Sequence, residues 1–145
     1  MKRDDILKEV SSWEGTPYVH QGMVKGVGTD CAMFVFAVAL KCKLLKKSDQ
    51  KRIPLYSIEW HLHNHEEKLL MALEDFGCTE INIEDVQPGD ILCFKYGRTS
   101  SHLGIMIDDT YFMHAAGEMK KVILSRLAGD YKKRLVHAYK FPGVQ

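Results

Sequence analysis

Nine consecutive apolar residues, Ala32 to Leu40, form the longest hydrophobic run in the chain. A helix that spans a membrane needs about 20 such residues, so this run must be buried by the rest of the protein. Thr29-Asp30 offers an N-cap just before it, and the lysines that follow suit the negative end of a helix. We therefore predict a central helix over residues 31–45, apolar on nearly all of its faces.

The segments on either side of this helix divide into two kinds. Residues 4–13 and 57–76 have apolar residues at helical spacing, and Gly77 follows the second segment as a C-cap. After Gly77 the pattern changes to short strands, which we predict at 91–95, 101–107, 110–115, 121–124 and 135–141. Helices followed by antiparallel strands indicate an α+β fold, with N-terminal helices packed on an antiparallel sheet of about five to six strands.

Length and charge exclude several classes of protein. The 145 residues suit a single domain over 1–145, and 46% hydrophobic with 27% charged residues excludes disorder. Twenty basic and 19 acidic residues give a net charge of +1 with no basic stripe, so we expect no nucleic-acid partner. Residues 1–10 are charged and contain no apolar signal-peptide core, so we expect cytoplasmic synthesis.

Cys31 differs from the other three cysteines. No pair has C-x-x-C spacing, and Cys42, Cys78 and Cys93 lie in apolar stretches that suit buried thiols. Cys31 begins the central helix after the glycine-rich loop 15–29, where free backbone N–H groups favour a thiolate. This position suits a catalytic nucleophile, but it also fits a small residue that simply starts a buried helix.

His102 and His114 are the best candidates for a base. Both lie on predicted strands joined near Asp108-Asp109, so they should face each other or lie one diagonal step apart. Their Cβ atoms would then be roughly 4.5–8 Å apart, close enough for one ring to orient the other. The alternative is two unrelated polar residues on a half-exposed sheet. With Cys31 as nucleophile, His102 as base and His114 as orienter, the chain order is papain-like.

The other histidines carry less information. His61, His63 and His65 alternate on a predicted helix, where a spacing of two points side chains about 200° apart. We therefore prefer a surface helix to a metal site, and we expect neither a metal nor another cofactor. His20 lies in the glycine-rich loop and could be a neighbour of the site.

Several segments together resemble the NlpC-type cell-wall cysteine peptidases. The opening Trp13 to Tyr18, then Gly22 and Thr29-Asp30-Cys31, is similar to the start of that family's domain. Further similar segments are Pro88-Gly89-Asp90-Ile91-Leu92, Ser101-His102-Leu103-Gly104-Ile105 and Phe112-Met113-His114-Ala115. Residues 18–21, 25–28, 54–60 and 140–142 resemble the phage-encoded branch, which is also found in gene transfer agents.

The resemblance implies a papain-like fold and hydrolysis of amide bonds in peptidoglycan stem peptides, with a preference for the bond after γ-linked D-glutamate. It implies that Tyr18 helps to stabilise the oxyanion, with the backbone N–H of Cys31 as a second donor. We expect Tyr18, Asp30 and His20 to bind substrate. Ala32-Met33 departs from the family's Ser-Gly pair, which removes a hydroxyl that can contact the substrate's amino end.

The partners and setting follow from the same resemblance. The domain leaves no room for a wall-binding repeat, so we expect targeting by an assembly such as a phage tail and action at the cell wall with a virion or after lysis. Two alternatives remain. One is a structural or tail-assembly module with weak or no activity. The other is a cysteine amidase or acyltransferase acting on another small amide or ester.

Overall fold

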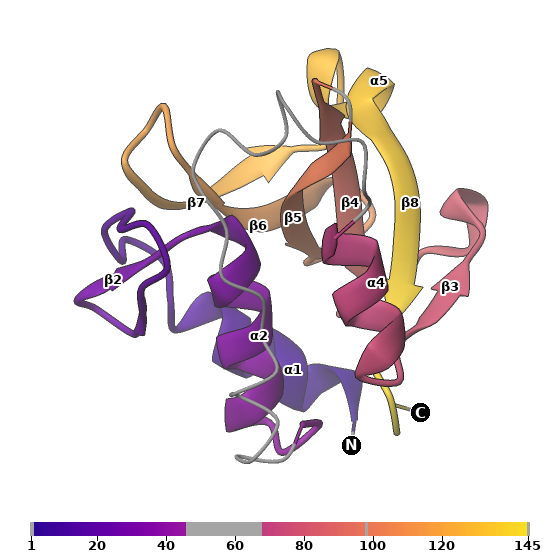
Figure 1. The fold of residues 1–145 in the computed structure, drawn as a ribbon, viewed down its shortest axis with the longest axis horizontal. Helices are drawn as coiled ribbons and strands as arrows, with labels where there is room; N and C mark the ends of the chain where they lie inside the picture. Colours follow the sequence, from indigo (N-terminus) through magenta and orange to yellow (C-terminus); the bar gives the residue numbers. More distant parts are fainter. Residues whose placement is uncertain (1, 46–67, 98, 145) are drawn as a thin grey trace.

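The structure is a computed structural model that describes residues 2–45, 68–97 and 99–144. Figure 1 shows the chain from end to end. The helices are α1 (Arg3–Ser11), α2 (Cys31–Lys41), α4 (Lys68–Asp75) and α5 (Asp130–Arg134), with a 3-10 turn at Ile83–Asp85. The strands are β1 (Met23–Val24), β2 (Gly28–Thr29), β3 (Thr79–Ile81), β4 (Ile91–Tyr96), β5 (Thr99–Met106), β6 (Tyr111–Ala116), β7 (Lys121–Arg126) and β8 (Leu135–Lys140).

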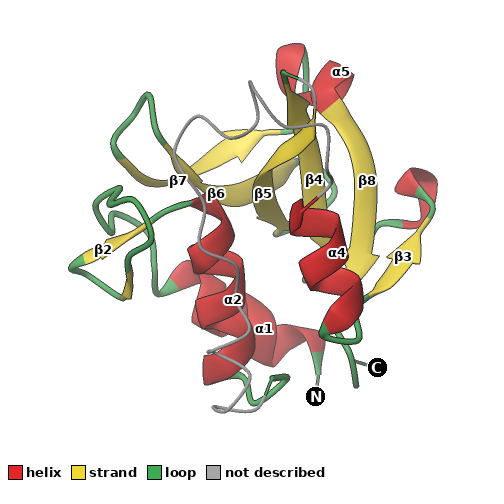
Figure 2. Cartoon of the chain, in the orientation of Figure 1, coloured by secondary structure: helices red, strands yellow, loops and turns green. Residues whose placement is uncertain are grey.

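Six antiparallel strands form the main sheet in the order β3-β8-β4-β5-β6-β7, while β1 and β2 pair separately within the glycine-rich loop. Helices α1, α2 and α4 gather on one side of this sheet (Figure 2). The α+β prediction is therefore confirmed. The sheet contains all five predicted strands and adds β3, a short edge strand paired with β8.

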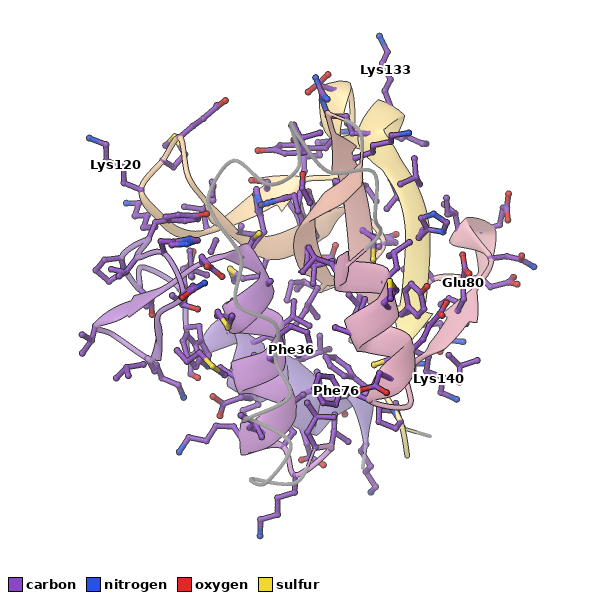
Figure 3. The ribbon with its side chains drawn as sticks, in the orientation of Figure 1. Phe36, Phe76, Glu80, Lys120, Lys133 and Lys140 are labelled. Atoms are coloured by element: carbon purple, nitrogen blue, oxygen red, sulfur yellow. The ribbon has the colours of Figure 1, made fainter. Side chains whose placement is uncertain are left out.

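Both faces of the sheet are covered. On β4, Ile91 and Cys93 belong to the main core with the helices, while Leu92 and Phe94 belong to a second cluster on the opposite face. A strand buried on both faces reads as a continuous apolar run, as β4 does. On the helical side, the rings of Phe36 on α2 and Phe76 meet edge to face with centroids 5.6 Å apart (Figure 3).

The helices begin close to where the sequence predicted but end earlier. Helix α2 starts at Cys31 and ends at Lys41, four residues before the predicted end at Leu45. Lys43 adopts a positive φ of 59°, and the amides of Leu44 and Leu45 turn back to the carbonyl oxygen of Ala39, which closes the helix. No helix in the described ranges is long and apolar enough to cross a membrane.

The predicted helix 57–76 is described only in part. Its last turns are α4, whose Leu69, Leu70 and Leu73 are buried as expected. Gly77 follows with a φ of +92°, the left-handed conformation of a C-cap. Trp60 and Leu62, also predicted to point inward, lie outside the described residues.

A buried ion pair ties the first helix to the sheet. Arg3 Nη1 donates to Asp90 Oδ1 at 2.7 Å and to the carbonyl oxygen of Pro88 at 3.0 Å. The other oxygen of Asp90 accepts the backbone N–H of Gln87 at 2.8 Å. Only 2% of the Asp90 side chain is exposed, so the turn that leads into β4 depends on the arginine to neutralise a buried carboxylate.

We expect Arg3→Ala to lower the free energy of unfolding by about 3 kcal/mol, because it leaves the Asp90 carboxylate buried without its partner. The matched control is Arg134→Ala, which breaks an exposed pair with Asp130 and should cost much less. Urea denaturation of both variants measures the difference. An equal loss of unfolding free energy in both variants would mean that the Arg3–Asp90 pair stabilises the fold no more than an exposed pair does.

Candidate active site

Asp30 fixes the start of α2 and therefore the position of Cys31. Its Oδ1 accepts the backbone N–H of Met33 at 2.9 Å, as an N-cap does, and its Oδ2 accepts the N–H of Gln21 at 2.6 Å. The side chain is fully buried, and His20 Nδ1 lies 3.7 Å from Oδ2. One carboxylate thus joins the glycine-rich loop to the helix that carries Cys31.

The thiol of Cys31 is protonated at rest. Burial, and to a smaller extent the neighbouring Asp30, raises its pKa to about 12 against the opposing effect of nearby backbone N–H groups. Cys31 Sγ lies 3.5 Å from the carbonyl oxygen of Ser101, to which it can donate. The sequence-based expectation of a thiolate at the helix start is therefore wrong for this state, because burial outweighs the helix end. A base must remove the proton.

The two histidines meet as their spacing predicts. Ile105 pairs with Met113 across β5 and β6, which places His102 one diagonal step from His114. His102 Nε2 and His114 Nδ1 are hydrogen-bonded at 2.7 Å. Gly104 leaves the room for this contact, since a Cβ there would lie 3.3 Å from the Cβ of His114. The alternative of two unrelated polar residues is excluded by the hydrogen bond.

Both imidazoles are neutral near pH 7. Burial and the neighbouring His114 lower the pKa of His102 to about 3, and burial lowers the pKa of His114 to about 4. Aromatic rings supply the apolar surroundings. The ring centroids of Phe94 and His102 are 5.7 Å apart, and those of Phe112 and His114 are 4.4 Å apart. Among the described residues, Nδ1 of His102 has no hydrogen-bond partner, so it is the nitrogen able to accept a proton.

A single cavity of about 490 Å³ brings the predicted residues together. Five of the six predicted site residues line it, and Asp30 instead lies buried behind it with both oxygens bonded within the chain. The lining residues are Tyr18, His20, Cys31, Tyr96, Ser101, His102, His114, Ala116, Gly117, Glu118, Met119, Asp130 and Tyr131.

Tyr18 can act as a hydrogen-bond donor in this cavity. Burial, together with Cys31 and Asp30, raises the pKa of its phenol above the ordinary range, so the hydroxyl keeps its proton. The backbone N–H of Tyr18 donates to the carbonyl oxygen of Lys120 at 2.8 Å, which holds the loop against the β6–β7 turn.

Sequence reasoning missed residues beyond the histidine pair. Ser125 Oγ lies 2.8 Å from His114 Nε2, and Tyr131 on α5 lines the cavity. Ile123 is the cross-strand partner of His114 in β7, so Ser125 shares its face of the sheet. The β6–β7 register could have identified Ser125, but the sequence does not determine that register. Tyr131 was missed because the short helix α5 has no periodic pattern.

The described residues contain no group of three histidine, cysteine or acidic side chains placed to hold a metal ion. His61, His63 and His65 lie outside the described residues. All four cysteines are free thiols.

A thiol at a helix start, in one cavity with two hydrogen-bonded imidazoles, fits a papain-like thiol hydrolase. The comparisons with known proteins agree with this class. The sequence profile of the NlpC/P60 family matches residues 15–140, and the chain belongs to that family.

One relative is similar to the chain in sequence, and two solved structures are similar to it in fold. A probable endopeptidase of Haemophilus influenzae is 30% identical over 113 residues, covering 77% of this chain but only 57% of the relative's length. The NlpC/p60 domain of the peptidoglycan hydrolase SagA has a TM-score of 0.68 at 19% identity and covers 97% of this chain and 99% of that one. RipD of Mycobacterium tuberculosis, described as a non-catalytic domain adapted to peptidoglycan binding, has a TM-score of 0.61 at 11% identity and covers 94% of each chain.

The neutral histidines predict an acid-sensitive fold. Below pH 6.5 the unfolded chain binds protons that the folded chain does not, because the pKa values of His102 and His114 are lowered to about 3 and about 4. The free energy of unfolding should therefore fall as the pH falls from 6.5 to about 4, by up to about 1.4 kcal/mol per pH unit for each histidine.

His114→Gln should make this dependence shallower, because it removes one of the two buried groups. The matched control is His137→Gln, which changes a partly exposed histidine on β8 that contacts Glu80 and should keep the steeper dependence. Urea denaturation at several pH values between 7 and 4 measures the slopes. Equal slopes for His114→Gln and wild type would contradict the lowered pKa values.

Proposed function

We propose that this chain is a cysteine peptidase that hydrolyses amide bonds in peptidoglycan stem peptides. The observation that carries the proposal is the presence of Cys31 and the hydrogen-bonded pair His102–His114 in one cavity. Membership of the NlpC/P60 family and the endopeptidase relative support the same activity.

The first chemical step forms an acyl-enzyme. His102 Nδ1 takes the proton of the Cys31 thiol while the sulfur attacks the amide carbon, giving a tetrahedral intermediate. The backbone N–H of Cys31 and the hydroxyl of Tyr18 are the donors assigned to its oxyanion. The imidazolium of His102 then protonates the amine nitrogen as the C–N bond breaks, which leaves a thioester and a free amine.

The second step releases the acid and restores the resting state. His102, neutral again, takes a proton from water as the water oxygen attacks the thioester carbon. The C–S bond breaks, the sulfur recovers its proton from His102, and the carboxylic acid product leaves. Throughout, His114 Nδ1 accepts the hydrogen bond from His102 Nε2–H and so holds the ring of His102.

The resting protonation states shape this mechanism. Burial raises the pKa of the Cys31 thiol and lowers that of the His102 imidazole, so both groups rest neutral. In the proposed mechanism the proton therefore moves as the sulfur attacks. Once the sulfur bonds to carbon, no thiolate needs to be held in the apolar cavity. The imidazolium of His102 keeps its hydrogen bond from Nε2–H to His114 while it holds the proton.

The finer assignment concerns the bond and the setting. We propose the bond after γ-linked D-glutamate as the preferred one, and a phage tail as the assembly that delivers the domain to the cell wall. The support is the resemblance of residues 18–21, 25–28 and 140–142 to the phage-encoded branch. We propose cytoplasmic synthesis followed by action at the wall with a virion or after lysis.

A non-catalytic, peptidoglycan-binding role is the second candidate, because RipD shares this fold and is described in those terms. The substituted pair Ala32-Met33 is the feature of this chain that favours it. The complete Cys31, His102 and His114 constellation favours hydrolysis instead.

Mass spectrometry of purified muropeptides incubated with the protein decides between the two. We expect wild type to cleave and Cys31→Ala to be inactive. The cleavage rate of His102→Ala should fall by about 10²–10⁴-fold, the typical contribution of a general base. His114→Ala should be milder, and His114→Asn should recover part of that loss because its amide oxygen can accept a ring N–H.

The matched control for these variants is His137→Ala, which lies on β8 outside the cavity and should stay near wild type. Circular dichroism checks that each variant is folded. Peptidoglycan binding by a folded wild type that releases no fragment would support the non-catalytic role.

Ala32 predicts tolerance at the substrate's amino end. Ala32 is fully buried at the start of α2 and has no hydroxyl to hold a free amino group. We therefore expect stem peptides still attached to glycan to be cleaved at a rate comparable to free peptides. Digestion of intact sacculi beside free stem peptides measures this, and a strict requirement for a free N-terminal L-Ala would contradict it.

A further inference from the structure

We propose that Ser125 and Tyr131 extend the histidine pair into a directional chain of hydrogen bonds that keeps His102 in the tautomer with an unprotonated Nδ1. Both are positioning residues, since they act through His114 and not on the reacting atoms. The inference rests on the proposed thiol chemistry of Cys31, and its test includes a readout that needs no substrate.

The contacts form an unbroken path. His102 Nε2 lies 2.7 Å from His114 Nδ1, and His114 Nε2 lies 2.8 Å from Ser125 Oγ. Burial raises the pKa of the Tyr131 phenol, and the Ser125 side chain lowers it, as a hydroxyl that donates to the phenol oxygen would. The ring of Tyr131 packs edge to face on that of His114, with centroids 5.2 Å apart and planes at 84°. Three strands and α5 thus meet along one line of polar atoms.

The direction of this chain decides which nitrogen of His102 is free. If His114 Nε2–H donates to Ser125 Oγ, His114 Nδ1 must accept, so His102 donates from Nε2 and its Nδ1 has a lone pair. If instead Ser125 donates to His114 Nε2, every bond reverses, and His102 carries its proton on Nδ1 with Nε2 as acceptor. Only the first arrangement leaves a nitrogen able to deprotonate Cys31.

Tyr131 favours the productive direction by giving Ser125 another acceptor. A serine hydroxyl has one hydrogen to donate and can accept two. When that hydrogen points to the Tyr131 oxygen, the lone pairs of Ser125 are left for the N–H of His114. Tyr131 lines the cavity, so its own hydroxyl hydrogen can point into the open space and need not compete for Ser125.

Nitrogen-15 NMR of histidine-labelled protein near pH 7 tests the tautomer directly, because protonated and bare ring nitrogens have well-separated shifts. We expect His102 in wild type to carry its proton on Nε2. Ser125→Ala should give a mixture of both tautomers, while Ser125→Thr, which keeps the hydroxyl, should retain the wild-type signature. Tyr131→Phe should shift His102 toward Nδ1–H, because the hydrogen of Ser125 then turns to His114.

Two kinetic measurements accompany the spectra. The rate of Cys31 alkylation by iodoacetamide and the kcat for muropeptide cleavage should both fall about threefold to tenfold in Ser125→Ala, the range expected for one lost neutral hydrogen bond. KM should be unchanged, since Ser125 acts through His114 and is assigned no contact with the substrate. Tyr111→Phe, an exposed tyrosine on β6, is the matched control and should leave tautomer and rates at wild-type values.

A double-mutant cycle tests whether Ser125 acts through His114. We call the hydrogen-bonded path from His102 through His114 to Ser125 the relay. The shorter side chain of His114→Asn can accept the Nε2–H of His102 without reaching Ser125, so Ser125→Ala should have no further effect on kcat in that background. An effect of the same size in both backgrounds, or an unchanged His102 tautomer in folded Ser125→Ala and Tyr131→Phe, would overturn the proposal. If no muropeptide is cleaved while the tautomer and alkylation rate still respond to Ser125, the peptidase assignment fails and the relay stands.

Discussion

The geometry of the site depends on the burial of α2 on nearly all of its faces. Nine of its residues, including Cys31 at its first position, are buried, and the helix packs against β5 and β6 on one side and α1 on another. Such a helix cannot rotate or slide without exposing apolar surface. Asp30 fixes its register at the N-terminal end by accepting the backbone N–H of Met33. The nucleophile is therefore held by the core itself, while the histidines come from the two strands against which the helix packs.

This burial has an energetic consequence. The same apolar surroundings that fix Cys31, His102 and His114 also remove their charges, since the pKa of the thiol is raised and those of the imidazoles are lowered. The site therefore rests as neutral groups linked by hydrogen bonds. In a neutral site the positions of the protons, and so the tautomers, decide whether a base is present. That is why a hydrogen-bond partner two contacts away from His102, such as Ser125, can affect the proposed chemistry.

The sequence predicted those parts of the site that local patterns determine. The start of α2 at Cys31 follows from an N-cap and an apolar run, and the meeting of His102 with His114 follows from a short turn between two strands. The protonation of Cys31 did not follow from the sequence, because it depends on how deeply the thiol is buried by segments distant in the chain. Ser125 was missed for a related reason: its contact requires the β6–β7 register, which the turn sequence alone does not specify.

Membership of the family does not by itself establish hydrolysis, because a domain of the same fold can be described as non-catalytic. The distinction must come from the atoms of the site. In this chain the thiol of Cys31 and the rings of His102 and His114 line one cavity, and the free nitrogen of His102 is the one that its hydrogen bond to His114 does not use. A scaffold that only bound peptidoglycan would gain no affinity from burying two neutral histidines, which lower its stability in acid. The proposed hydrolysis gives this buried pair a role, because His102 would carry a proton between the thiol and the leaving amine.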